Sequence, residues 1–254
     1  MRWAERAFVG EGTEIVGCAL AAGATPEALF VAAEARGDHE VAELAAWTLD
    51  NGARVFTLAA GVADRIADTV TPHPVFGVFA MTDRPLEDLA HPTLAVACVD
   101  VRDPGNAGTV LRSADAAGVG AVLFCGTSVD PFNPKTVRSS AGSIFHVPLA
   151  VVPEPLRALG WLSAAGLAVY AADPTGTDYA GLELVAPCAF VLGNEAAGLP
   201  DTVRNAADAV VAIPMVGGAE SLNVAVSCAV LCFEAARQRR SVPSRPTGAD
   251  DPVA

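Results

Sequence analysis

Three polar, glycine-containing loops each follow a short apolar run, and this pattern constrains the fold more than any other feature of the chain. The loops read DPGNAGTVLR at 103–112, LGNEAAGLP at 192–200 and IPMVGGAESLN at 213–223. Each preceding run has the length and composition of a buried strand. Because ligands bind in open α/β sheets outside the carboxyl ends of the strands, the three loops predict a single binding site at one edge of a sheet.

Strands and helices alternate along the whole chain, which predicts α/β architecture with a mostly parallel sheet. The first unit, 1–82, has helical patterns at 15–22, 39–52 and 61–69 and strand patterns at 28–35, 53–59 and 75–81. A polar, proline-bearing segment at 83–92 predicts a linker. The tail, 241–254, lacks an apolar pattern and is predicted to be disordered.

The second unit, 93–240, carries the three loops. Its predicted strands are 93–100, 121–125, 146–152, 167–173, 188–193 and 209–215, and its predicted helices are 106–117, 153–166 and a closing helix, with a short helix or turn at 134–142. The closing helix is expected to bury one stripe of apolar residues, namely Leu222, Val226, Ala229, Val230 and Phe233. Neither the dinucleotide fingerprint GxGxxG nor a P-loop occurs, which argues against a standard nucleotide-binding domain.

Composition excludes several classes of protein. The chain is 52% hydrophobic but has no unbroken apolar run long enough to span a membrane, and its acidic N-terminus is unlike a signal peptide, so a cytosolic protein is expected. The six cysteines lie mostly in apolar runs without metal-ligand spacing, which favours core packing and predicts no metal. The net charge of −13 argues against general nucleic-acid coating, so any RNA site needs locally gathered cations.

Each loop also has a purely structural interpretation. Asn106 or Ser221 could cap a helix, and Glu195 could stabilise a helix N-terminus. Arg112 is harder to explain in this way, because a guanidinium on an alanine-rich helix needs a phosphate or carboxylate acceptor. The arginines at 237, 239 and 240 suit either RNA or the C-terminal dipole of the closing helix.

Taken together, the three loops resemble the motifs of the SpoU/TrmH-type RNA 2′-O-ribose methyltransferases of the SPOUT superfamily. The resemblance covers about residues 93–240, and PKTVRSSAG at 134–142 fits it as well. The segment FVGEGTEIVGCALAAGATPEALFV at 8–31 is similar to the small ribosomal-protein-like RNA-binding domain that often precedes such enzymes.

This resemblance implies a C-terminal domain with a trefoil knot, a bound S-adenosylmethionine and a homodimer in which Arg112 of one subunit faces the cofactor of the other. The implied catalytic set is Asn106, Arg112, Glu195, Ser221 and Asn223. The implied cofactor-binding set is Leu192, Gly193, Asn194, Ile213, Met215, Ser221, Leu222 and Asn223. The residues expected to contact RNA are Arg102, Lys135, Arg138 and Ser140.

The expected reaction is transfer of a methyl group to a ribose 2′-hydroxyl of RNA, with ribosomal RNA favoured over transfer RNA. Two other classes stay open at this point. One is a non-catalytic RNA-binding or ribosome-assembly factor with the same fold, and the other is an α/β enzyme that acts on a small molecule. The acidic charge suits the small-molecule enzyme, whereas the intact polar residues of the loops favour catalysis on RNA.

Overall fold

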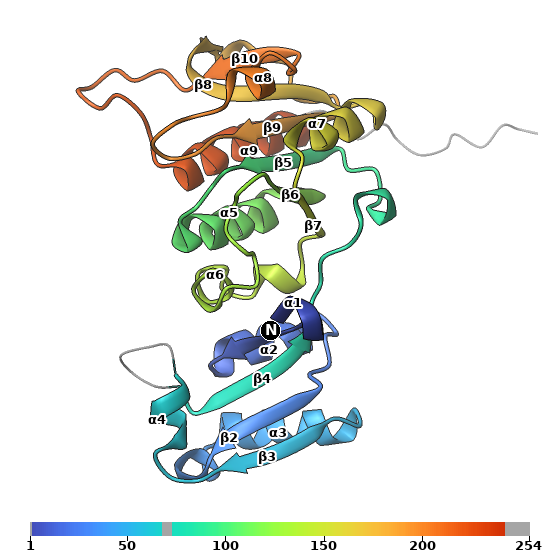
Figure 1. Ribbon diagram of the computed structural model, residues 1–254, viewed down its shortest axis with the longest axis vertical. Coiled ribbons are helices and arrows are strands. Elements are labelled where there is room, and N and C mark those ends of the chain that lie inside the picture. The colour runs from blue at the N-terminus through green and yellow to red at the C-terminus, as the bar shows by residue number, and fades with distance from the viewer. Residues whose placement is uncertain (1, 68–72, 242–254) are drawn as a thin grey trace, which may run out of the picture.

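The computed structural model describes residues 2–67 and 73–241, and their strands form two separate sheets (Figure 1). The first sheet comes from the N-terminal third of the chain and the second from the remainder. The expected α/β architecture is confirmed. Of the tail predicted at 241–254, residues 242–254 lie outside the described residues.

The N-terminal sheet has four strands in the order β1-β4-β2-β3. Its elements are α1 (Arg2–Glu5), β1 (Ala7–Glu11), α2 (Thr13–Ala21), β2 (Ala28–Ala32), η1 (Ala33–Ala35), α3 (His39–Asp50), β3 (Arg54–Leu58), α4 (Val62–Ile66) and β4 (Val75–Ala80). Strand β4 is antiparallel to β1 and β2, and β2 is parallel to β3. The sequence patterns did not predict β1, and the strand predicted at 28–35 is shorter in the structure, because Ala33–Ala35 form the 3₁₀ helix η1.

The C-terminal sheet has six strands in the order β10-β8-β9-β5-β6-β7, and every neighbouring pair is parallel. Its strands are β5 (Leu94–Val99), β6 (Ala121–Cys125), β7 (Leu149–Val152), β8 (Ala168–Asp178), β9 (Cys188–Leu192) and β10 (Ala209–Ala212). Its helices are α5 (Pro104–Ala117), α6 (Pro134–Ser139), η3 (Ser143–Phe145), α7 (Pro155–Ala164), η4 (Tyr179–Gly181), α8 (Asp201–Arg204) and α9 (Val224–Arg240).

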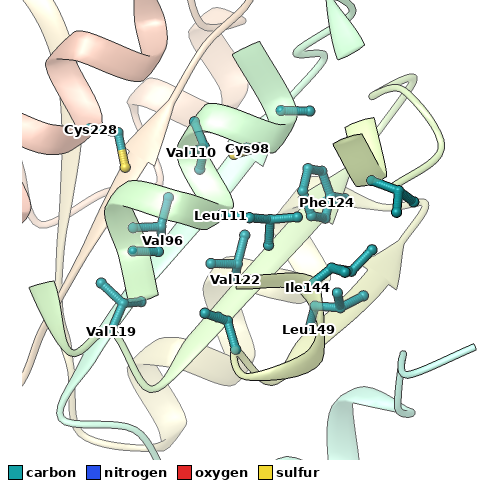
Figure 2. Packing of buried hydrophobic residues seen from close by; sticks show 14 of the residues in the cluster. Val96, Cys98, Val110, Leu111, Val119, Val122, Phe124, Ile144, Leu149 and Cys228 are labelled. Atoms are coloured by element: carbon teal, nitrogen blue, oxygen red, sulfur yellow. The ribbon is translucent and has the colours of Figure 1, made fainter. Parts of the chain in front are cut away.

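Helices cover both faces of the six-stranded sheet, as a parallel sheet requires. On one face, Val96, Val122 and Phe124 pack against Val110 and Leu111 of α5 (Figure 2). On the other face, the alternate strand residues pack against α7. Five of the six cysteines are buried, and burial raises the pKa of the Cys125 thiol to about 12, which confirms core packing as their role.

The expected burial of α9 is wrong. Its buried residues are Val224, Ala225, Cys228, Leu231, Cys232 and Ala235, which contact α5 and the sheet. Val226 and Phe233 are instead 46% and 43% exposed. Two apolar stripes run along this helix, and sequence periodicity alone could not decide which one faces the core. In the outer stripe, defined here as Val226, Val230 and Phe233, Val226 and Phe233 are exposed in the isolated chain, whereas Val230 is half-buried.

Aromatic packing joins the two units. Phe8 of β1 lies 5.0 Å from Phe132 and 5.6 Å from Phe145, measured between ring centroids, and Phe79 lies 4.9 Å from Phe145. The segment 83–92 contains η2 (Leu86–Asp88) and lies against β7, where the Arg84 backbone N–H donates to the Leu149 carbonyl at 3.0 Å. No helix within the described ranges is both long and apolar enough to cross a membrane.

Candidate functional site

A cavity of about 450 Å³ lies where the three loops converge, at the carboxyl ends of the strands. Its walls include all eight residues of the expected cofactor-binding set, from Leu192 at the end of β9 to Asn223 at the start of α9. Asn106 and Glu195 of the expected catalytic set lie on the same walls. The structure therefore brings the three loops together, as the sequence predicts.

Asp103, rather than Asn106, caps α5. The Asp103 carboxylate accepts a hydrogen bond of 2.8 Å from the backbone N–H of Asn106, and the helix begins at Pro104. A carboxylate at this position satisfies an N–H group that has no partner within the helix. The side-chain amide of Asn106 is thereby free to serve the cavity.

Asn223, rather than Ser221, caps α9. Its side-chain oxygen accepts hydrogen bonds from the backbone N–H groups of Ala225 and Val226. Its side-chain nitrogen donates to the Asn106 side-chain oxygen at 2.8 Å. The two ends of one amide therefore hold the helix start and the first loop together. Ser221 lines the cavity and is left available to a ligand.

Glu195 completes this network from the second loop. One carboxylate oxygen accepts from the Asn106 side-chain nitrogen at 2.9 Å, and the carboxylate also accepts from the backbone N–H groups of Arg102 and Asp103 at 3.4 and 3.3 Å. Partial burial raises the pKa of Glu195, but these hydrogen bonds outweigh burial, so the net pKa lies below its ordinary value. Glu195 is therefore a carboxylate at neutral pH.

Gly193 and Asn194 shape the second loop. Asn194 and Gly198 exchange two backbone hydrogen bonds, and the Asn194 side-chain oxygen accepts from the N–H groups of Ala196 and Ala197. A Cβ atom on Gly193 would lie 2.5 Å from the backbone carbon of Gly198. The loop can fold back this closely only with glycine at position 193.

The cavity also has walls that the sequence patterns did not predict, among them Ala172, Asp173 and Pro174 in the middle of β8. The Asp173 side chain accepts hydrogen bonds from Thr175 and lies 3.4 Å from the Arg204 guanidinium. The hydrogen bonds from Thr175 lower the pKa of Asp173. The position was accessible to prediction, because Asp173 is the last residue of the strand predicted at 167–173, which pairs with β9 and so ends at the same edge as the other loops.

Arg112 lies apart from the other expected catalytic residues. It follows Asn106 by six positions, which places it about 120° away around α5 at 100° per residue. It is exposed, and it is not one of the described residues that line the cavity. Within one chain, the Glu195 carboxylate accepts a side-chain hydrogen bond from Asn106, which lines the cavity.

The four expected RNA contacts fall into different environments. Arg102 and Lys135 are exposed near the start of α5, and the Lys135 amino group lies 3.7 Å from the Asp103 carboxylate. Arg138 is half-buried in the last turn of α6. The expectation for Ser140 is wrong, because its side chain is fully buried and its hydroxyl donates to the Val137 carbonyl at 2.7 Å.

Arg239 has a structural role. Its guanidinium donates to the carbonyls of Leu184, Thr93 and Ala186 at 2.9, 2.8 and 3.0 Å. These contacts attach the end of α9 to the loop before β9. As for metals, the described ranges contain no cluster of three or more histidine, cysteine or carboxylate side chains that could hold an ion.

Comparison with known proteins agrees with this geometry. The family described as SpoU rRNA Methylase matches residues 93–233, and the MRM3-like substrate binding domain matches residues 1–77. The chain is 37% identical over 175 residues to a Streptomyces viridochromogenes 23S rRNA (uridine(2479)-2′-O)-methyltransferase, a match that covers 65% of this chain and 61% of that protein. It is 36% identical over 186 residues to the Bacillus subtilis 23S rRNA (guanosine(2553)-2′-O)-methyltransferase RlmP, covering 73% of each.

Solved structures resemble nearly the whole chain. An AdoMet-bound rRNA methyltransferase from Sinorhizobium meliloti is 35% identical, with a TM-score of 0.82 over 93% of this chain and 89% of that one. The SpoU methyltransferase AviRb from Streptomyces viridochromogenes, in complex with AdoMet, is 28% identical, with a TM-score of 0.82 over 95% and 94%. The convergent loops, the cavity and the family match over 93–233 lead to one conclusion: this chain belongs to the SpoU rRNA methylase family.

Proposed function

We propose that the protein transfers a methyl group from S-adenosylmethionine to a ribose 2′-hydroxyl of ribosomal RNA. The observation that carries the proposal is the network of Glu195, Asn106 and Asn223, which joins three separate loops at the wall of one cavity. The names of the Streptomyces and Bacillus relatives, both 23S rRNA 2′-O-methyltransferases, support this reaction and favour ribosomal RNA over transfer RNA.

The cavity fits the proposed cofactor in its chemistry. Leu192, Ile213, Met215 and Leu222 supply apolar walls, whereas Asn194, Ser221 and the backbone of the loops supply polar groups. Such a mixture suits a ligand with a flat base and a polar sugar. When bound, S-adenosylmethionine supplies an activated methyl group on a positively charged sulfur. These residues would hold and orient it. In the second loop, the Gly193 backbone lies close to the Gly198 backbone, so the two sides of the loop are near each other.

The side chains at the cavity then have separate tasks. Asn106 and Ser221 would orient the RNA hydroxyl, and the ionised Glu195 holds Asn106 in place. Positioning of this kind can lower a barrier by about 7–11 kcal/mol. The Arg112 guanidinium would bind the target phosphate and stabilise the negative charge that develops on the attacking oxygen. A guanidinium keeps its proton in ordinary surroundings, so a role as a simple base is disfavoured.

A homodimer would place Arg112 at the cavity of the partner subunit. Two observations support the dimer. Arg112 is exposed and lies away from the cavity of its own chain, and the outer stripe of α9 leaves large apolar side chains in solvent. Exposed apolar stripes of this kind are typical of association surfaces.

We also propose that the six-stranded domain contains a trefoil knot and that the enzyme acts in the cytoplasm.

Methyl transfer to purified ribosomal RNA tests the proposal. Protein incubated with radiolabelled S-adenosylmethionine should label ribosomal RNA at 2′-hydroxyl groups, mapped by resistance to alkaline hydrolysis. Cells with and without the protein should differ at the same nucleotide. Labelling of transfer RNA alone would show that transfer RNA, and not ribosomal RNA, is the substrate. Cofactor binding without labelling of any RNA would favour an assembly factor.

A further inference from the structure

Within residues 2–67 and 73–82, one face of the N-terminal sheet has no long helix packed on it. The face toward α2 and α3 carries Leu29, Val31, Val75 and Phe79, which pack in the main core with residues of those helices. The alternate residues point the other way. We define this open face as Val9, Ala28, Phe30, Phe56, Phe76 and Val78. Among the described residues, the short α4 packs against it at one end of the sheet, through Ala63 (Figure 1).

Three phenylalanines form a row across the open face. The strand register pairs Phe56 of β3 with Phe30 of β2, and Phe30 with Phe76 of β4. The rings of Phe30 and Phe56 stack, with centroids 5.2 Å apart and planes 20° from parallel. Phe56 is 41% exposed and Phe30 is half-buried, whereas Phe76 is buried beside α4. The Phe56 ring is therefore partly in solvent at the β3 edge.

A cation accompanies the exposed ring. The Arg54 guanidinium lies 5.6 Å from the Phe56 ring centroid, and Arg54 is the neighbour of Phe56 on the same face of β3. An aromatic ring on an open sheet with an arginine beside it can stack an unpaired base and contact the adjacent phosphate. The combination suits single-stranded nucleic acid better than a second protein, because the guanidinium adds a charge that complements a phosphate.

We propose that this open face binds an unpaired segment of the RNA substrate, with a base stacked on Phe56 and a phosphate held by Arg54. The inference rests on the proposed function and extends it by assigning the recognition surface. It agrees with the description of the matched domain at 1–77 as substrate binding. It also shows how a chain with a net charge of −13 can hold RNA, since stacking needs few cations.

Replacement of Phe56 tests the proposal. Phe56→Ala should raise the KM for ribosomal RNA in the methyl-transfer assay by roughly 5- to 100-fold, as expected for the loss of one stacked base. The affinity for S-adenosylmethionine and kcat should stay as in the wild type. Phe56→Trp should keep the wild-type KM, because its ring still stacks. The matched control is Leu49→Ala, which removes a side chain that is 58% exposed on α3, away from the open face.

A second measurement separates this idea from the proposed function. Titration of a labelled oligouridine, with a blunt duplex of the same length for comparison, should show weaker single-strand binding for Phe56→Ala and Arg54→Ala. If the wild type methylates no RNA, the proposed reaction is wrong. This titration still shows whether the open face binds single-stranded RNA. Wild-type binding and KM in Phe56→Ala would overturn the inference. Loss of self-association in that variant, with RNA binding intact, would also overturn it by showing that the face binds a second copy.

Discussion

At the scale of single residues, Asn106 illustrates why an amide suits the centre of this site. It must accept a hydrogen bond from Asn223 and donate one to Glu195 at the same time. Hydroxyl and carboxylate side chains cannot match both partners with this reach and geometry, whereas an asparagine amide has an acceptor and a donor at its two ends.

Asn106→Ala should therefore reduce the kcat of methyl transfer on the order of 10²-fold, comparable to loss of one well-placed donor at a reacting oxygen. The fold should be little affected, because Asp103 still caps α5. The control is Thr109→Ala, an exposed position on the next turn of the same helix. Single-turnover assays and thermal unfolding check both variants, and equal activity in the two would contradict a role for Asn106.

Glu195 gives the network a defined pH dependence. Its folded-state pKa is lowered, so its contribution to stability is complete above the unfolded-state pKa and is lost as the pH falls through the folded-state value. Glu195→Gln should remove this pH-dependent contribution to the free energy of unfolding. In urea unfolding between about pH 3 and pH 7, the difference in free energy of unfolding between the wild type and the variant should shrink as the pH falls. A difference that stays constant across this range would show that the charge of Glu195 contributes nothing.

The site residues were predictable to different degrees. The eight expected cofactor-binding residues all lie on the cavity, because a strand that ends in a glycine loop fixes where its next residues lie. The alternative interpretation of Asn106 and Ser221 as caps is wrong. Asp103 and Asn223 cap these helices instead, because all four residues are good caps and only the backbone path selects among them. Ser140 was misplaced because no local pattern reveals that a turn will be covered.

At the scale of elements, the loop after β9 depends on a glycine at one specific point. A methyl group on Gly193 would meet the backbone of Gly198 and Leu199, which cannot move aside as a side chain could. Gly193→Ala should destabilise the protein by about 1–3 kcal/mol, as overpacking does. It should also weaken binding of S-adenosylmethionine, because the loop forms a wall of the cavity.

Gly160→Ala is the matched comparison. Gly160 lies in α7, and a Cβ atom there would have no neighbour within 4 Å. Alanine has the higher helix propensity, so this variant should be more stable by about 0.5–1 kcal/mol and should bind the cofactor normally. Denaturant unfolding and calorimetric titration measure both effects. A Gly193→Ala protein as stable as wild type would show that the loop has another accessible conformation.

Most elements of the fold were predictable because each has a clear period and a glycine or proline boundary. The exceptions have physical causes. Strand β1 is only five residues long and includes Gly10, so its alternation is too short to separate from a loop. In α9, two apolar stripes compete, and the one chosen from the sequence is the exposed one. A period identifies a helix, but only its neighbours decide which side is buried.

At the scale of the whole molecule, the outer stripe of α9 leads to a prediction about assembly. Phe233→Glu should convert the proposed dimer to a monomer, because a carboxylate buried at an apolar interface lacks a partner. Leu156→Glu is the control, since Leu156 is 52% exposed on α7 on the opposite side of the sheet. Light scattering after gel filtration distinguishes the two. A dimer that survives the substitution at 233 would locate the interface elsewhere.

The position of Arg112 calls for a test across two subunits. Arg112→Ala and Asn106→Ala should each be nearly inactive as homodimers. In a mixed dimer, the Arg112→Ala subunit keeps an intact cavity and receives Arg112 from its partner, so one complete site forms. Random exchange makes about half of the dimers mixed, each with one working site, so activity should return to about a quarter of wild type. If each chain used its own Arg112, mixing would restore nothing, because every cavity would still lack either Asn106 or the arginine.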